Sequence, residues 1–198
     1  MFTPELLQLA VDRSTGKSSK QLDSLFEELY EIYVNDPNSS TLREHITASL
    51  ANCDPIAGKL GRDCKCKLTG EEKEIKPKNY YRSTTNGGGC FNDYTRLRYL
   101  KDYAVNLPII SSLFVYGRVM YVVEYKFKQI ADKLDKQVTD ICENKGQRYV
   151  RSCAWTYEQW YNDPNLIVHY LDKDYIHEHH VKGHFKIRTK LYEKLMSL

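Results

Sequence analysis

The sequence contains no long uninterrupted hydrophobic run. Its longest apolar stretches are broken within about ten residues, by Gly117, Glu124 or Lys126, whereas a membrane-spanning helix needs about 20 apolar residues in a row. The N-terminus also lacks a basic segment followed by an apolar one, which is the pattern of a secretory signal peptide. We therefore expect no contact with a membrane and an intracellular setting: the cytosol, the nucleus or a virion.

The chain also lacks a strong excess of one charge. Lysine and arginine together number 29 and aspartate and glutamate 26, so the formal net charge is only +3. This total is too small to predict nucleic-acid binding on its own. The sequence shows neither an internal repeat nor a low-complexity segment. With 41% hydrophobic and 28% charged residues, a chain of 198 residues is expected to fold as one domain of ordinary size.

The first part of the chain is helical in pattern. Thr3-Pro4 is a helix cap followed by proline at the first helical position. Apolar residues recur at helical spacing over residues 22–33, and Thr41 with Glu44 matches a capping box. We interpret residues 1–55 as a helical N-terminal region.

Regular periodicity disappears over residues 56–92. This segment holds the Gly87-Gly88-Gly89 run, further glycines, and a cluster of charges over residues 71–78. We interpret it as a long loop region rich in cysteine and glycine. A loop of this length inside a compact domain is usually functional, mobile or fixed by a local constraint.

Residues 93–198 have the pattern of an α+β core that ends in a basic helix. Two strands, residues 107–115 and 118–127, are expected to pair as a β-hairpin around Tyr116-Gly117. Segments with apolar residues at helical spacing precede and follow this hairpin. A further strand is expected over residues 166–171, and a final helix is expected after it. The predicted fold class is therefore α+β: a helical N-terminal region and a central hairpin in a small mixed sheet flanked by helices.

The strongest lead to chemistry is Glu124 with Lys126, near the end of the second hairpin strand. Strand side chains alternate between faces, so these two residues are expected to lie side by side on one face. A carboxylate on one strand with Glu-x-Lys on its neighbour can hold Mg²⁺ or Mn²⁺ while the lysine orients the attacking water. Over residues 107–141 this pattern resembles the core of the restriction-endonuclease-like, or PD-(D/E)xK, nucleases. An ordinary ion pair on a sheet is the alternative explanation.

The resemblance implies a second carboxylate, and here the sequence departs from the family pattern. Family members carry an aspartate on or near the first hairpin strand, where this chain offers only Ser111 and Ser112. Asp102 and Asp93 lie upstream and would serve if the chain folds them back. The expected function is that of a nucleic-acid-associated protein, either a metal-dependent nuclease-like domain or a decayed relative.

Two basic clusters are candidates for contact with phosphates. The first interleaves its cations with tyrosines, a mixture that can follow a phosphate backbone and stack on bases; the second makes the C-terminus basic. A solvated helix face is the alternative reading. The candidate nucleic-acid-binding residues are Arg96, Arg98, Lys101, Lys186, Arg188 and Lys190.

The cysteines support a different class of function. Cys53, Cys64, Cys66 and Cys90 fall in one loop-rich window, and four thiolates can bind a tetrahedral Zn²⁺. The alternative function is therefore a non-catalytic, zinc-stabilised binding or assembly protein, for example a viral structural or accessory protein, with other proteins or its own copies as partners. Disulfides and free thiols remain open as the state of the cysteines.

Overall fold

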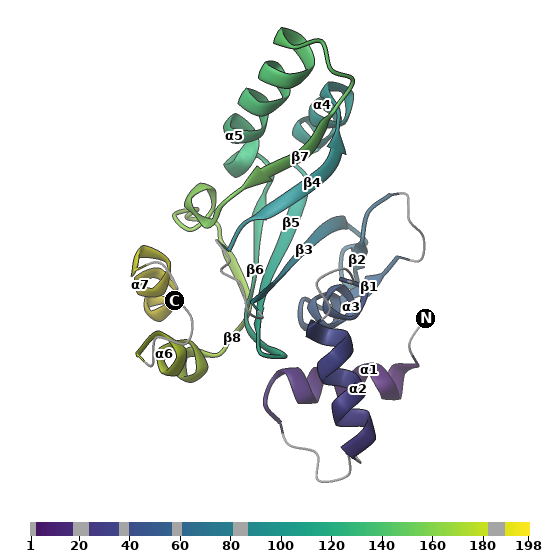
Figure 1. The fold of residues 1–198 in the computed structure, drawn as a ribbon, viewed down its shortest axis with the longest axis vertical. Helices are drawn as coiled ribbons and strands as arrows, with labels where there is room; N and C mark the ends of the chain where they lie inside the picture. The colour runs from purple at the N-terminus through teal and green to yellow at the C-terminus, as the bar shows by residue number, and fades with distance from the viewer. Residues whose placement is uncertain (1–2, 18–23, 36–39, 57–60, 81–86, 182–188) are drawn as a thin grey trace.

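We describe the protein from a computed structural model. The structure describes residues 3–17, 24–35, 40–56, 61–80, 87–181 and 189–198. Helices flank a six-stranded mixed sheet and a separate two-stranded ribbon (Figure 1). The predicted α+β fold class is therefore confirmed. Among the helices that the structure describes, none combines the length and apolar character that a bilayer crossing requires.

The N-terminal part is helical, as predicted. It forms α1 (Pro4–Ser14), α2 (Ser24–Asn35) and α3 (Thr41–Leu50). The Thr3 hydroxyl accepts a hydrogen bond from the Leu6 backbone N–H at 3.3 Å, so the predicted cap is present. The helices α1 to α3 lie against one face of the sheet, where they share a hydrophobic core with its strands (Figure 1).

The six-stranded sheet has the order β1-β2-β3-β5-β6-β8. Its strands are β1 (Cys53–Pro55), β2 (Cys64–Cys66), β3 (Glu72–Tyr80), β5 (Pro108–Val115), β6 (Arg118–Lys126) and β8 (Ile167–Leu171). The predicted hairpin is confirmed as β5 and β6, which pair antiparallel. Tyr116 and Gly117 connect them with φ of 45° and 78°, the positive values that a two-residue type I′ turn needs.

The prediction of a long loop over residues 56–92 was wrong. This segment supplies β2, β3 and most of β4 (Gly89–Tyr94), and β3 pairs parallel with β5 in the middle of the sheet. Five of the nine residues of β3 are lysine or glutamate, and they lie on both faces of the strand, so no apolar periodicity was visible. The charged side chains Lys73 and Glu74 are nevertheless buried, at 6% and 3% relative exposure, because each has ionic partners inside the fold.

Side chains of β5 divide between two cores. Ile109 belongs to the core on one face of the sheet, and Ile110 belongs to the core on the other face, beneath α1 to α3. The first core is covered by the ribbon β4–β7 and by helices from the second half of the chain (Figure 1). The elements of that half are α4 (Arg96–Ala104), α5 (Lys128–Val138), the π-helix η1 (Thr139–Asn144), β7 (Val150–Trp155), the 3-10 turn η2 (Tyr157–Gln159), α6 (Lys173–Val181) and α7 (Thr189–Ser197).

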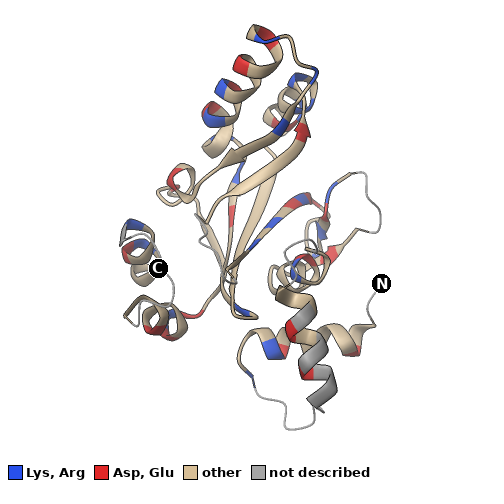
Figure 2. Ribbon diagram, viewed as in Figure 1, with Lys and Arg blue, Asp and Glu red and all other residues tan. Residues whose placement is uncertain are grey.

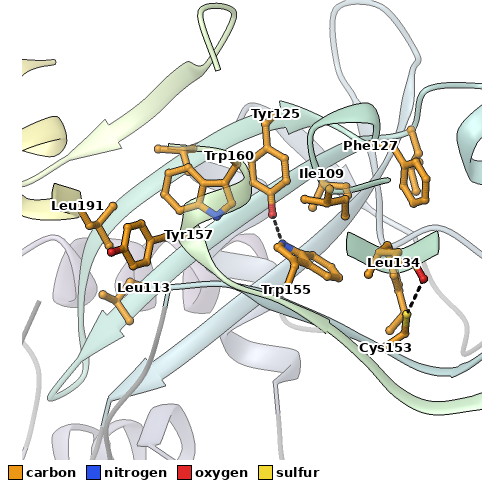
Figure 3. Close-up of a cluster of buried hydrophobic side chains, with 14 of the residues drawn as sticks. Ile109, Leu113, Tyr125, Phe127, Leu134, Cys153, Trp155, Tyr157, Trp160 and Leu191 are labelled. Atoms are coloured by element: carbon orange, nitrogen blue, oxygen red, sulfur yellow. Dashed lines mark hydrogen bonds between the residues drawn. The ribbon is translucent and has the colours of Figure 1, made fainter. Parts of the chain in front are cut away.

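Aromatic residues fix the ribbon to the sheet. The Trp155 indole N–H donates to the Tyr125 hydroxyl at 2.8 Å, and the Trp160 ring stacks on Tyr125 with 5.5 Å between centroids (Figure 3). Both tryptophans are almost fully buried. Stacked, hydrogen-bonded rings hold the two layers in one register.

Gly88 permits the closest backbone approach in this ribbon. A Cβ atom at Gly88 would lie 1.8 Å from the Trp155 carbonyl oxygen, which is part of the backbone and is not free to move away. We expect Gly88→Ala to lower the free energy of unfolding by roughly 3 kcal/mol, at the upper end of overpacking costs. Urea denaturation measures the change. Gly146→Ala is the control: Gly146 has φ of 66° and open space around it, so only backbone strain of about 1 kcal/mol is expected there.

Candidate active site

A cavity of about 720 Å³ lies beside β3, β4 and α4. Both acidic and basic residues lie along β3, which borders the cavity (Figure 2). The cavity is lined mainly by charged and polar residues: Gly61, Arg62, Asp63, Glu72, Glu74, Lys76, Cys90, Phe91, Asn92, Thr95, Leu97, Arg98, Lys101 and Asp102. A pocket of this size fits a small ligand or part of a larger one.

Asp63 is held in place by the backbone of β3. The chain reaches Asp63 directly before β2, which pairs antiparallel with β3. Asp63 donates its backbone N–H to the Lys73 carbonyl oxygen at 3.1 Å, and its Oδ2 accepts from the Ile75 N–H at 2.7 Å. The carboxylate is thereby fixed next to the middle of β3.

Glu74 and Lys76 lie two residues apart on β3 and so share one face of the strand. Lys76 Nζ lies 2.7 Å from Glu74 Oε1 and 3.9 Å from Asp63 Oδ2. Burial, and after it the nearby Glu74 carboxylate, raise the pKa of Asp63 to about 6, although Lys76 opposes the rise. Two carboxylates therefore repel each other around a single ammonium group.

One carboxylate oxygen in this group has no hydrogen-bond donor among the described residues. Glu74 Oε2 is buried and accepts no hydrogen bond from the described residues; Arg62 Nη1 lies 3.7 Å from it. Buried carboxylate oxygens normally have a hydrogen-bond donor or a cation. Glu74 Oε2 therefore keeps its capacity to accept a further hydrogen bond or to bind a cation.

Asp102 holds two guanidinium groups at the same cavity. Its Oδ1 lies 2.6 Å from Arg62 Nη2, and its Oδ2 accepts from the Tyr94 hydroxyl at 2.7 Å and lies 3.8 Å from Arg98 Nε. Arg98 Nη2 reaches Glu74 Oε1 at 3.4 Å. Each arginine thus bridges Asp102 and Glu74, and Asp102, at 1% relative exposure, orients both of them.

The structure does not bring the predicted catalytic residues together. Glu124 accepts from Lys73 Nζ at 2.8 and 2.9 Å and lies 2.9 Å from His169 Nε2, while Lys126 pairs with Glu71 at 3.0 Å. Lys73 and Glu74 are neighbours on β3 and point to opposite faces, so Glu124 lies on the face away from the cavity.

The two upstream aspartates have separate environments. Asp102 lines the cavity, as described, and Asp93 is exposed on β4. Both lie on the side of the sheet that carries the cavity and the ribbon strand β4, whereas Glu124 is opposite Ile110 and lies on the other side. The predicted second carboxylate is therefore not beside the first.

Only some of the predicted nucleic-acid-binding residues line the cavity. Arg98 and Lys101 line the cavity, whereas the Arg96 guanidinium contacts Asp135 and Glu143 and connects α4 to α5 and η1. Lys190 is exposed on α7. Lys186 and Arg188 lie outside the described residues.

The structure separates one of the four candidate zinc ligands from the other three. Cys53, Cys64 and Cys66 lie on β1 and β2, while Cys90 lies on β4 and lines the cavity. Among the described residues, no group of three or more histidine, cysteine, aspartate or glutamate side chains could hold a metal ion on its own. All six cysteines are free thiols.

Sequence reasoning missed Asp63, Glu74 and Lys76. The signal was present, because Glu74-Ile75-Lys76 is one of the other Glu-x-Lys sequences in the chain and has an aspartate upstream. The residues around it lack periodicity and predict a loop, where residues two apart have no fixed relation. A strand assignment for residues 72–80 would have placed the motif on one face.

Comparison with models of protein families gives no match to this chain, and comparison with curated protein sequences gives none either.

Proposed function

We propose that this protein is a metal-dependent nuclease in which Asp63 and Glu74 bind the metal ion and Lys76 positions the attacking water. The supporting observation is the approach of both carboxylates to one lysine, 2.7 Å from Glu74 and 3.9 Å from Asp63. An aspartate next to one strand, with Glu-x-Lys on its antiparallel neighbour, is the arrangement that the resemblance to PD-(D/E)xK nucleases implies. The proposal keeps the predicted reaction and moves it from Glu124 and Lys126 to these residues.

The donor set suits Mg²⁺ or Mn²⁺ better than Zn²⁺. Magnesium is commonly bound by one or two carboxylates, several waters and a substrate phosphate. Two carboxylates are present, and Glu74 Oε2 has no hydrogen-bond donor among the described residues. A bound Mg²⁺ or Mn²⁺ would supply Lewis-acid activation of the phosphate and would favour a hydroxide nucleophile.

The remaining residues of the cavity have roles that follow from their charge. Lys76 can donate a hydrogen bond to a water molecule and hold it for attack on phosphorus. Arg62 and Arg98 carry guanidinium groups, which bind phosphate oxygens in a two-pronged geometry. Asp102 fixes both arginines, and Lys101 adds positive charge at the rim of the cavity. These cations support a nucleic-acid phosphodiester as the substrate.

The test is a cleavage assay on duplex DNA, single-stranded DNA and RNA. We expect cleavage of at least one of them with Mg²⁺ or Mn²⁺, and none with excess chelator. Failure to cut any of them, by folded protein with either metal, contradicts the proposal. It would favour the alternative of a non-catalytic binding or assembly protein.

Arg98 gives a prediction about substrate binding. Arg98→Gln is expected to raise KM about tenfold and to reduce the salt dependence of binding by about one counterion, because one phosphate contact is lost. Fluorescence anisotropy over a salt series measures the slope. Arg96→Gln is the matched control on the same helix. Arg96 does not line the cavity. Its guanidinium is held by Asp135 and Glu143 at 2.5 and 2.7 Å, whereas Arg98 lies 3.4 and 3.8 Å from Glu74 and Asp102, so the salt slope should stay unchanged in the control. An equal change in both variants contradicts the assignment.

A further inference from the structure

The hairpin formed by β1 and β2 carries three cysteines on one face. Cys53 lies directly opposite Cys66, and Cys64 lies two residues before Cys66 on the same strand. Residues opposite each other and residues two apart on a strand share a face. Cys53 and Cys64 are buried, whereas Cys66 is partly exposed. The hairpin therefore pairs one accessible thiol with a buried one.

Backbone hydrogen bonds identify the type of pair that Cys53 and Cys66 form. The Lys67 N–H donates to the Asn52 carbonyl oxygen at 3.1 Å, one residue beyond Cys66 and one before Cys53. This bond flanks the cysteines, so they are a non-hydrogen-bonded pair of an antiparallel ladder. Such pairs have Cα atoms about 4.5 Å apart, within the range of about 4.4 to 6.8 Å that a disulfide can span.

Cys64 is the competing partner, because a side-chain hydrogen bond joins its thiol to the Cys53 thiol in the reduced chain. Its direct partner across the ladder is Pro55, so it is diagonal to Cys53. It is two residues from Cys66 along an extended strand, where Cα atoms are roughly 6.5 to 7 Å apart. The pairing register favours a bond between Cys53 and Cys66, and the bond between Cys53 and Cys64 is the alternative that the test must exclude.

The three thiols also differ in reactivity. Hydrogen bonds from the Thr69 hydroxyl, and then from the backbone of Thr69 and Leu68, lower the pKa of Cys66. Burial raises the pKa of Cys53 and of Cys64. The thiolate is the nucleophile in thiol oxidation, so Cys66 is the thiol that an oxidant reaches and reacts with first.

We propose that Cys66 is a peroxide-oxidised modification site whose sulfenic acid is resolved by Cys53 as a cross-strand disulfide. In the first step the Cys66 thiolate attacks one peroxide oxygen; the S–O bond forms, the O–O bond breaks and hydroxide leaves. In the second step the Cys53 thiol attacks the sulfenic sulfur; the S–S bond forms, the S–O bond breaks and water leaves with the thiol proton. Peroxide is the two-electron oxidant. This proposal does not depend on the nuclease activity.

The test is peptide mapping of the reduced full chain after treatment with hydrogen peroxide and alkylation of the remaining thiols. Trypsin cuts after Lys65, so it separates Cys64 from Cys66. We expect the peptide that contains Cys53 to be joined to the peptide that contains Cys66, in a product two hydrogens lighter than the sum of its parts. Dithiothreitol should reverse the link. A link through Cys64, a link between two molecules or no link overturns the proposal.

Variants separate the two steps. In Cys53→Ser we expect the Cys66 sulfenic acid to accumulate and to be trapped by dimedone, because the resolving thiol is gone. In Cys64→Ser the link between Cys53 and Cys66 should form as in the unaltered chain. Cys90, which is also partly exposed, is the internal control in the unaltered protein and needs no variant. Oxidation of Cys66 no faster than that of Cys90 overturns the assignment.

Discussion

Replacement of Glu74 by glutamine is expected to reduce metal-dependent cleavage by about a thousandfold, as when a central electrostatic group of an active site is removed. Glu74→Gln keeps the size of the side chain and removes the charge that would bind the metal ion. The rate of cleavage under saturating substrate and a titration of Mn²⁺ binding measure the two consequences. Both should fall, because a neutral amide is a much poorer ligand for a hard cation.

Glu124→Gln is the matched control for this experiment. Both residues belong to a Glu-x-Lys motif on a strand, and both carboxylates are buried, at 3% and 2% relative exposure. They differ in surroundings, since Glu74 shares its lysine with Asp63 whereas Glu124 is engaged by Lys73 and His169. Cleavage should therefore survive in Glu124→Gln that is folded by circular dichroism. Loss of cleavage in this variant, with activity retained in Glu74→Gln, would return the active site to the residues first predicted.

The pair of motifs shows how far the sequence could determine the site. The type of motif, and the chemistry that goes with it, followed from residue types and spacing. The choice between Glu74-x-Lys76 and Glu124-x-Lys126 did not, because it depends on which strand has an aspartate beside it. Asp63 reaches Glu74 only through the antiparallel pairing of β2 with β3, which is a tertiary contact.

The elements of the fold also differ in whether local sequence could predict them. The hairpin of β5 and β6 was predictable because two apolar runs flank Tyr116-Gly117, and helix α2 because its apolar residues repeat at helical spacing. Strand β3 was not, because a rule that assigns charged residues to the surface fails where each charge is neutralised inside the fold. Lys73 and Glu74 on opposite faces of one strand are both such cases.

Removal of the Glu124 carboxylate is expected to have the largest effect on stability. Lys73 and Glu124 form an ion pair at 2.8 Å whose side chains are only 8% and 3% exposed. In Glu124→Ala the Lys73 ammonium is left buried without its main partner, which typically costs about 3 to 5 kcal/mol. We expect a decrease of that order in the free energy of unfolding at pH 7, measured by urea denaturation.

The double variant tests whether the cost comes from an isolated charge. Lys73→Met combined with Glu124→Leu removes both charges and fills the space with apolar atoms, so its loss of stability should be well below that of Glu124→Ala. An equal or larger loss of unfolding free energy in the double variant would mean that altered packing, and not the unpaired Lys73 ammonium, accounts for the effect.

The acid dependence of stability gives an independent measure of the same pair. Burial raises the pKa of Glu124, but hydrogen bonds from His169 and Lys73 outweigh burial and hold the pKa below its ordinary value of 4.5. A carboxyl group whose pKa is lower in the folded than in the unfolded state contributes stability in full above the unfolded pKa. That contribution is lost as the pH falls through the folded pKa. The difference in free energy of unfolding between the unaltered protein and Glu124→Gln should therefore be constant near neutral pH and shrink below pH 4.5. A difference that stays the same at acidic pH would mean that the folded state does not stabilise the ionised carboxylate.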